Sequence, residues 1–227
     1  MPTVLITGAN RGLGLEFVRQ YAANGWRVIA TCRNPLGLGD LAQAQGNIEI
    51  HGLDVTDTRQ VDKLAAELDG QCIDVLINNA GIYGPRTNSP TDFDTAQWAQ
   101  VFAVNVMAPL KVAGAFIPHL SHSHNAKIIT VSSKMGSMHD NTSGGSYIYR
   151  SSKAALNAVM KSLSIDVLEN KISVAVLHPG WVQTDMGGPS ALIDAKTSVA
   201  GMHKVINGLT IDKTGHFYNY DGAPIAW

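Results

Sequence analysis

Six short apolar runs, separated by segments with helical spacing, constrain the fold of this chain more than any other feature. Each run has the length and the β-branched content of a strand. Hydrophobicity is continuous along the runs rather than alternating, which is typical of strands buried on both faces. We therefore predict an α/β fold in which a parallel sheet carries helices on both faces, joined by right-handed crossovers. The predicted strands are 3–6, 27–30, 48–50, 75–77, 128–131 and 173–177, and the predicted helices include 13–24, 57–68, 95–110 and 149–169.

The composition is that of a folded chain with no strongly charged surface. Of the 227 residues, 45% are hydrophobic and 15% are charged, a balance that excludes disorder and coiled coil. No linker or repeat divides the chain, so we expect a single domain over residues 1–227. The 17 basic and 18 acidic residues nearly balance, which argues against binding to nucleic acid or to an acidic membrane surface.

The cysteines and the chain start predict a cytoplasmic protein. Cys32 and Cys72 lack metal-ligand spacing and lie in or beside apolar runs, so we expect small core residues in a reducing compartment, with no disulfide. The first residues enter a strand pattern at once, without the basic and apolar segments of an export signal. No apolar run reaches the ~20 residues of a membrane helix.

A glycine-rich turn follows the first predicted strand. The sequence TGANRGLG at residues 7–14 leads directly into a helical segment. Parallel sheets bind ligands beyond the carboxyl ends of their strands, and glycines before the free N–H groups of a helix N-terminus suit a phosphate. The spacing GxxxGxG differs from the GxGxxG dinucleotide fingerprint. A phosphate cradle is therefore favoured, with a plain strand-to-helix turn as the alternative.

Cationic residues stand where an NAD-selective site has an acid. Such a site places an acidic residue about 20 positions beyond the glycines, to bind the ribose 2′-hydroxyl. Here Glu16 is the only acid between Gly14 and Asp40, and Arg33 follows the second strand. Arg33 and the Arg11 of the glycine turn are suited to bind a 2′-phosphate. We therefore expect NADP(H), the alternative being two solvated surface arginines.

Two further polar segments follow the third and fourth strands. Asp54 can accept a hydrogen bond from an adenine amino group, or serve only as a turn residue. Asn78 and Asn79 precede Ala80-Gly81 and suit a close backbone approach to a ligand, with side-chain bonds that tie neighbouring strands together. An ordinary Asn-Gly type of turn is the alternative.

A tyrosine and a lysine lie four residues apart at the start of a helical pattern. This spacing puts Tyr149 and Lys153 on one helix face. An ammonium near a phenol favours the phenolate and lowers its pKa from ~10, which allows proton exchange with an alcohol or carbonyl. The alternative is a solvated helix face. Tyr147 has Ser151 rather than a lysine four residues later.

These motifs, with others farther along, resemble those of the short-chain dehydrogenase/reductase family. They are TGANRGLG, Asp54, NNAG, Asn105, Ser132-Ser133, Tyr149 with Lys153, and Pro179-Gly180 followed by Thr184. They occur in the family's order across essentially the whole chain. The stretches GGSYIYRSSKAALNAVMKSLS and HPGWVQTDMGG, with the ending NYDGAPIAW, further resemble its C-factor and sniffer-type carbonyl reductase branch.

The resemblance implies a Rossmann-type doubly wound sheet of about seven strands, and NADP(H)-dependent interconversion of a small-molecule ketone or aldehyde with an alcohol. Tyr149 is then the general acid, and Lys153 lowers its pKa and holds the nicotinamide ribose. Ser133 binds the substrate oxygen, and Asn105 completes a proton relay through water to Lys153. The implied cofactor-binding residues are Gly8, Asn10, Arg11, Gly12, Leu13, Gly14, Arg33, Asp54, Val55, Asn79, Ala80, Gly81, Tyr149, Lys153, Pro179, Gly180, Val182 and Thr184.

The spacing between serine and tyrosine departs from the family pattern. The common interval is 13 positions, whereas Ser133 precedes Tyr149 by 16, which implies a three-residue insertion within 137–146. Ser132 and Ser137 therefore remain alternatives to Ser133. Because adjacent strand residues point to opposite sides, at most one of Ser132 and Ser133 reaches a substrate.

The histidines do not predict a metal site. His119, His122 and His124 have no carboxylate or cysteine beside them, so a polar helix end is favoured over metal binding. His178, after a buried strand, is expected to be a hydrogen-bonded structural residue.

The sequence is compatible with two functions and does not determine the oligomeric state. One function is a carbonyl reductase, and the other is a signalling or regulatory protein that keeps the dinucleotide pocket as a structural ligand site. The segment 186–197 should border a fairly open, apolar substrate site. The family resemblance also implies pairing of long helices into a homodimer or homotetramer.

Overall fold

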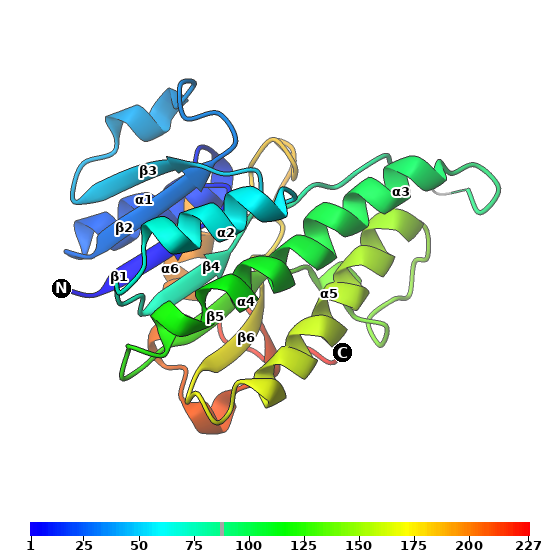
Figure 1. Cartoon of the computed structure of the whole chain (residues 1–227). Helices are drawn as coiled ribbons and strands as arrows, with labels where there is room; N and C mark the ends of the chain where they lie inside the picture. Colours follow the sequence, from blue (N-terminus) through cyan, green and yellow to red (C-terminus); the bar gives the residue numbers. More distant parts are fainter. Residues whose placement is uncertain (87–88) are drawn as a thin grey trace.

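The fold is built on one seven-stranded parallel sheet, shown in Figure 1. The structure, a computed structural model, describes residues 1–86 and 89–227. The strand order is β3-β2-β1-β4-β5-β6-β7, which reverses direction between β1 and β4 and makes the sheet doubly wound. The strands are β1 (Thr3–Ile6), β2 (Arg27–Cys32), β3 (Ile48–Gly52), β4 (Val75–Asn78), β5 (Lys127–Val131), β6 (Ser173–His178) and β7 (His216–Asn219).

Each of the six predicted strands is confirmed, and the expected seventh is β7. The central strands β1 and β4 are buried along their whole length, as continuous apolar runs require. β7 lies at the edge of the sheet and pairs with β6, and of its four residues one is exposed, one is buried and two are partly buried. An edge strand needs no continuous apolar run, which is why this segment gives no strand signal.

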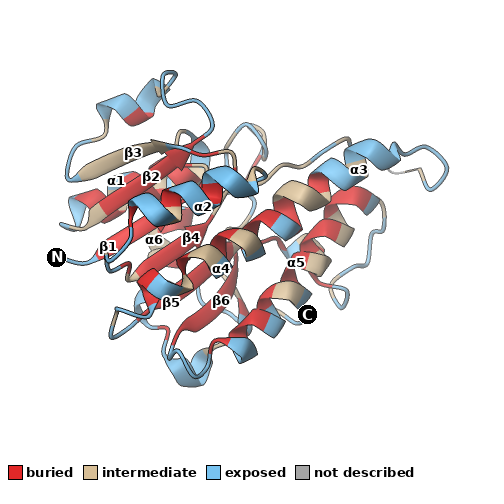
Figure 2. Ribbon diagram, in the orientation of Figure 1, coloured by how far each residue is buried: buried red, intermediate tan, exposed pale blue. Residues whose placement is uncertain are grey.

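Helices cover both faces of the sheet. In Figure 1, α2, α4 and α5 lie on one face and α1 and α6 on the other. Each layer has its own buried apolar cluster against the sheet, one centred on Val112, Phe116 and Leu156 and the other on Phe17, Tyr21 and Met202. Figure 2 shows this burial on the inward side of the helices. The α-helices are α1 (Gly12–Ala23), α2 (Thr58–Glu67), α3 (Thr95–Phe102), α4 (Ala108–Leu120), α5 (Tyr147–Asp166) and α6 (Ala195–Asn207).

The predicted helix at 95–110 is longer than expected and contains a π-helical turn. The turn Ala103–Met107 joins α3 to α4, so that one helical segment runs over Thr95–Leu120. By length and composition alone this segment passes as a membrane span, with a mean hydropathy of 1.6 over an 18-residue stretch. However, α4 buries Val112, Phe116 and other side chains against the sheet, as expected of a core helix.

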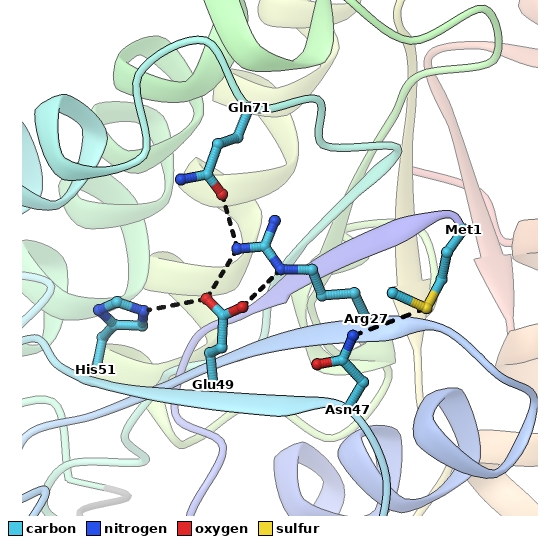
Figure 3. Close-up of polar contacts among 6 residues, drawn as sticks. All are labelled: Met1, Arg27, Asn47, Glu49, His51 and Gln71. Atoms are coloured by element: carbon cyan, nitrogen blue, oxygen red, sulfur yellow. Dashed lines mark hydrogen bonds and ion pairs between the residues drawn. The ribbon is translucent and has the colours of Figure 1, made fainter.

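A polar cluster holds the edge strand β3 to β2, at the amino end of β2. Arg27 donates to both carboxylate oxygens of Glu49, at 2.7 and 2.8 Å, and to Gln71 at 2.7 Å (Figure 3). His51 Nε2 lies 3.9 Å from the same carboxylate. Since ligands of parallel sheets bind at the opposite, carboxyl edge, this cluster is structural.

One prediction about the cysteines is wrong. Cys32 is buried at the end of β2 as expected, but Cys72 is exposed. Cys72 lies between the turn that ends at Gln71 and the first residues of β4, so the apolar run beside it begins only after it. Both thiols are free.

Candidate active site

The carboxyl ends of β1 and β4 approach each other closely at the point where the strand order reverses. A Cβ built on Gly8 would lie 2.9 Å from the Cα of Ala80, and Gly8 has a φ of +65°. The space beside Gly14 is smaller still, since a Cβ built there would clash with the carbonyl oxygen of Gly8. These glycines allow the first turn of α1 to fold against the β1 and β4 loops.

The N-terminus of α1 leaves its backbone N–H groups without a side-chain cap. Arg11 is the N-cap residue and makes no capping bond, and the first turn contains no acid. By contrast, α2, α3 and α6 are capped by Asp57, Asp94 and Asp194. Uncapped N–H groups at the positive end of a helix dipole are a site for an anion such as a phosphate.

Asn79 ties the two loops together, as the sequence predicts. Its side-chain amide donates to the carbonyl oxygens of Thr7 and Gly8, at 2.9 and 3.0 Å. Its backbone N–H donates to the Thr7 hydroxyl, which also accepts from the N–H of Ala80. The β1 and β4 loops are therefore one rigid unit.

The two arginines proposed for a 2′-phosphate have different surroundings. Arg11 donates to Asp185 at 2.6 Å, which connects the glycine turn to the segment after β6. Arg33 is exposed beyond β2, close enough to Asp54 to help lower the pKa of that carboxyl. The larger cause of this lowering is a pair of hydrogen bonds from Thr56, which give Asp54 the turn geometry that was its alternative interpretation.

Ser133 and Tyr149 meet at the end of β5. Ser133 is close enough to the Tyr149 phenol for its hydroxyl to act to lower the pKa of that phenol. Ser132 points the other way and donates to Asn157 at 2.7 Å in the interior. Ser137 donates to the carbonyl oxygen of Ala226 at 2.6 Å, near the last residues of the chain. Of the three serines that the sequence leaves open, the structure brings only Ser133 to Tyr149.

Lys153 and Asn105 complete the cluster. The Lys153 ammonium lies 5.7 Å from the Tyr149 ring centroid and donates to the carbonyl oxygen of Val131 at 3.0 Å. Asn105 lies in the π-helical turn, where its Oδ1 accepts from Ile82 and its Nδ2 donates to Ile82 and Ser152. π-Helical turns are frequent at functional sites because they redirect one residue out of the helical register.

Burial reverses the expected pKa shift of Tyr149. The phenol is shielded from solvent, and the loss of hydration raises its pKa to about 12, against the smaller opposing effect of Ser133. Burial also lowers the pKa of Lys153 itself, to about 8. Burial therefore acts on the pKa of Tyr149 against the direction expected from Lys153, and the lowering of that pKa by Lys153 stays a prediction.

The predicted insertion forms a loop that leaves the helix in place. Gly144 and Gly145 have φ of 62° and 65°, which suits glycine, and Ser146 has the left-handed φ of 48°. Arg150, one residue after the tyrosine, donates to Ser143, to Gly144 and to the carbonyl oxygen of Met135. The loop is thus fastened to the start of α5.

The segment after β6 returns to the glycine turn. Thr184 lies opposite Gly12, whose Cβ would be 3.6 Å from the threonine methyl group. Val182 forms an isolated bridge with Ile193, and Pro179 accepts a hydrogen bond from Ser198. The exposed apolar side chains on this segment agree with the expected open, apolar border; they are Trp181, Met186 and Leu192.

Histidines take no part in this cluster. His119 is buried, and its Nε2 lies 3.0 Å from the carbonyl oxygen of Ala65. Burial, with the charge of Lys134, lowers the pKa of His178 to about 4. The Nδ1 of His178 has no partner among the described residues, contrary to the hydrogen bond that we expected. Over the same residues, no group of three or more potential ligands could hold a metal ion.

Tyr83 belongs to this site although no sequence pattern indicates it. Tyr83, two positions after Gly81, stacks on the ring of Tyr149 with 4.3 Å between ring centroids. A tyrosine in a loop carries no periodic signal, so only the folded chain shows this contact.

Known proteins share both the sequence pattern and the fold. A family profile described as short chain dehydrogenase matches residues 2–192. C-signal of Myxococcus xanthus is 45% identical over 155 residues, which cover 68% of this chain and 93% of that protein. The carbonyl reductase Sniffer of D. melanogaster superposes with a TM-score of 0.93 at 39% identity, covering 100% of both chains. An NADPH-bound carbonyl reductase from chicken fatty liver superposes with a TM-score of 0.92 at 37% identity, covering 100% of this chain and 99% of that one.

The profile match spans six of the seven strands, and the structural matches extend over the whole chain. The doubly wound sheet, the glycine turn and the serine, tyrosine and lysine side chains at its carboxyl edge stand in the order that the motifs imply. The chain therefore belongs to the short-chain dehydrogenase/reductase family, in its C-factor and sniffer-type branch.

Proposed function

We propose that this single-domain chain reduces a ketone or aldehyde to an alcohol with NADPH, and catalyses the reverse oxidation with NADP⁺. The observation that carries the proposal is the meeting of Ser133, Tyr149 and Lys153 at the edge of the sheet, beside the glycine turn. The likeness to NADPH-bound carbonyl reductase supports the choice of cofactor and of reaction.

The residues of the glycine turn fit a dinucleotide. The uncapped N-terminus of α1 offers N–H groups to the diphosphate, and Arg33 offers its guanidinium to a 2′-phosphate. Gly81 keeps open the space in front of the catalytic groups, since its Cβ would lie 3.4 Å from Asn105 Oδ1 and 3.7 Å from Lys153 Nζ. When bound, the cofactor supplies the hydride.

The side chains supply orientation and the proton. Ser133 donates a hydrogen bond to the carbonyl oxygen, and Tyr149 gives that oxygen its proton as the alkoxide forms. Because burial raises the pKa of Tyr149 to about 12, the phenol is protonated at neutral pH and is ready to act as the acid. Lys153, in its protonated form, stabilises the phenolate that is left, and Asn105 holds the loop after β4 beside it.

Substitution of the phenol tests the proposal. Tyr149→Phe should abolish carbonyl-dependent NADPH oxidation, measured by absorbance over a panel of ketones and aldehydes, while the Kd for NADPH changes less than about 3-fold. Tyr147→Phe is the matched control, because Tyr147 is partly exposed on the same helix turn and should keep wild-type turnover. Near-normal turnover in Tyr149→Phe refutes the assignment. Tight NADPH binding by the wild-type protein, with no oxidation over the whole panel, favours instead a regulatory protein that keeps the dinucleotide as a structural ligand.

A further inference from the structure

Tyr83 lies against the ring that the proposed reaction uses. The two rings are stacked at 17° between their planes, with centroids 4.3 Å apart. Tyr83 comes from the loop after β4, whereas Tyr149 comes from the first turn of α5, so the stack joins two elements that are far apart in the sequence. Aromatic pairs at this distance attract each other beyond the effect of their buried area.

Tyr83 is itself held from two other sides. Its hydroxyl lies 3.0 Å from the hydroxyl of Ser146, the N-cap residue of α5. The guanidinium of Arg86 lies 4.7 Å from the Tyr83 ring centroid, within the range of a cation–π interaction. Arg86 also donates to the carbonyl oxygen of Met186 at 3.0 Å, in the segment after β6. The ring of Tyr83 is therefore held in place by contacts that do not involve Tyr149.

This stack restrains the side chain of Tyr149, the proposed general acid, against swinging away from the site. The Tyr149 hydroxyl has to stay in reach of both Ser133 and a substrate oxygen. A rotation about χ1 would swing the hydroxyl away from both, whereas a rotation about χ2 only turns the ring about the axis that carries the hydroxyl. The staggered wells of χ1 put the hydroxyl at different places, so the site needs a neighbour that keeps the ring in one of them. A displacement of 1 Å at a reacting group can cost about 100-fold in rate. A neighbouring ring in parallel contact supplies the missing restraint.

We propose that Tyr83 is a positioning residue for Tyr149, held in place by Arg86 and Ser146. This inference rests on the proposed reductase function. Tyr83 acts through the ring of Tyr149 and takes no proton itself, so its ring matters more than its hydroxyl. Its loss should lower kcat while the binding of NADPH at the glycine turn is unchanged.

The kinetic test compares Tyr83→Leu with Tyr83→Phe. The leucine variant should lose roughly 10-fold or more in kcat, with the KM for NADPH within about 2-fold of wild type. The phenylalanine variant keeps the stack and should restore kcat to within about 3-fold of wild type. Tyr147→Leu, a tyrosine lost from the same helix end without a stack on Tyr149, should leave kcat unchanged. If Tyr83→Leu keeps the kcat of wild type, or if phenylalanine does not restore it, the positioning role is refuted.

A second measurement separates this inference from the proposed function. In protein with ¹³C-labelled tyrosine, the Tyr149 ring signals should carry a ring-current shift that Tyr83→Leu removes and Tyr83→Phe retains. This readout requires no turnover. Loss of the shift with unchanged kcat overturns the positioning role while the reductase function stands. A wild-type protein that shows the shift but reduces no carbonyl overturns the proposed function, and the positioning role fails with it.

A third experiment tests the contact between Arg86 and Tyr83. Arg86→Gln should lower kcat about 2- to 3-fold in the wild-type background and have no further effect in Tyr83→Leu, because contacting residues that act as a unit are not additive. Equal losses in both backgrounds would refute the action of Arg86 through Tyr83.

Discussion

Two adjacent serines at the end of β5 should respond to substitution in opposite ways. Ser132 and Ser133 point to opposite sides of the strand, one into the core and one towards Tyr149. Ser132 donates to Asn157 at 2.7 Å, and both residues are almost fully buried. Ser133 accepts from the N–H of Met135 at 3.1 Å, and its hydroxyl acts to lower the pKa of the phenol. Replacing each by alanine removes a single oxygen atom from almost the same place in the fold.

Ser132→Ala should cost stability. The substitution leaves Asn157 Oδ1 without its donor in the interior, which costs about 1 to 3 kcal/mol of the free energy of unfolding. For a chain of this length, each kcal/mol lowers Tm by about 2 to 4 °C, so the expected fall is roughly 2 to 12 °C. The kcat for carbonyl reduction should stay within about 3-fold of wild type, because the lost hydroxyl faces away from the site.

Ser133→Ala should cost catalysis. A donor aimed at the oxygen that gains charge is worth about 100- to 1000-fold in kcat, while the Kd for NADPH should not change. Calorimetry and carbonyl-dependent NADPH oxidation, measured on both variants, give the comparison. The reasoning is refuted if Ser132→Ala loses kcat by such a factor and Ser133→Ala does not, since the sides of the strand would then be reversed.

Three further predictions concern the cofactor and the pH profile. Arg33→Ala should weaken NADPH binding about 10- to 150-fold and hardly affect NADH binding, because charged hydrogen bonds contribute about 1.5 to 3 kcal/mol. An equal rise in the two dissociation constants would show that the 2′-phosphate binds elsewhere. Asp185→Asn should raise NADPH affinity by no more than about 5-fold, since it frees Arg11 from an exposed ion pair of about 0.2 to 1 kcal/mol; a weakened Kd would contradict this competition. Lys153 must be protonated to stabilise the phenolate, and burial lowers its pKa to about 8. The kcat for reduction should therefore fall as pH rises through about 8. A kcat that stays constant up to the ordinary lysine pKa of ~10.4 would contradict this expectation.

The sheet was predictable where strands are buried on both faces. The apolar run at Val75–Asn78 carries its own signal, because every residue on it faces protein. His216–Asn219 does not, because an edge strand with partly exposed residues has no continuous run. Cys72 shows the same limit, since it is exposed although the next residue, Ile73, is buried. Sequence patterns therefore locate the layers of this fold better than they locate its edges.

The order of groups along the site was predictable, but their contacts were not. Helical spacing alone places Tyr149 and Lys153 on one face of α5. The choice among the serines depended on which way each one points after β5. The interval between serine and tyrosine could not decide it, because the loop at 137–146 changes that interval. Tyr83 has no fixed spacing from Tyr149, so no pattern connects the two rings. Contacts between loops depend on the path of the backbone, which local sequence does not determine.

The pKa of Tyr149 shows how burial alters a conclusion drawn from charge alone. The sequence pairs an ammonium with a phenol, which by itself lowers the phenol's pKa. The fold also removes both groups from water, and desolvation favours the neutral form of each, so the pKa of Tyr149 rises and that of Lys153 falls. For carbonyl reduction this is the useful arrangement, because an acid must hold its proton until the substrate oxygen becomes basic. The same low-polarity surroundings then strengthen the attraction between the new phenolate and a protonated Lys153, so the lysine exerts its effect when the proton has moved.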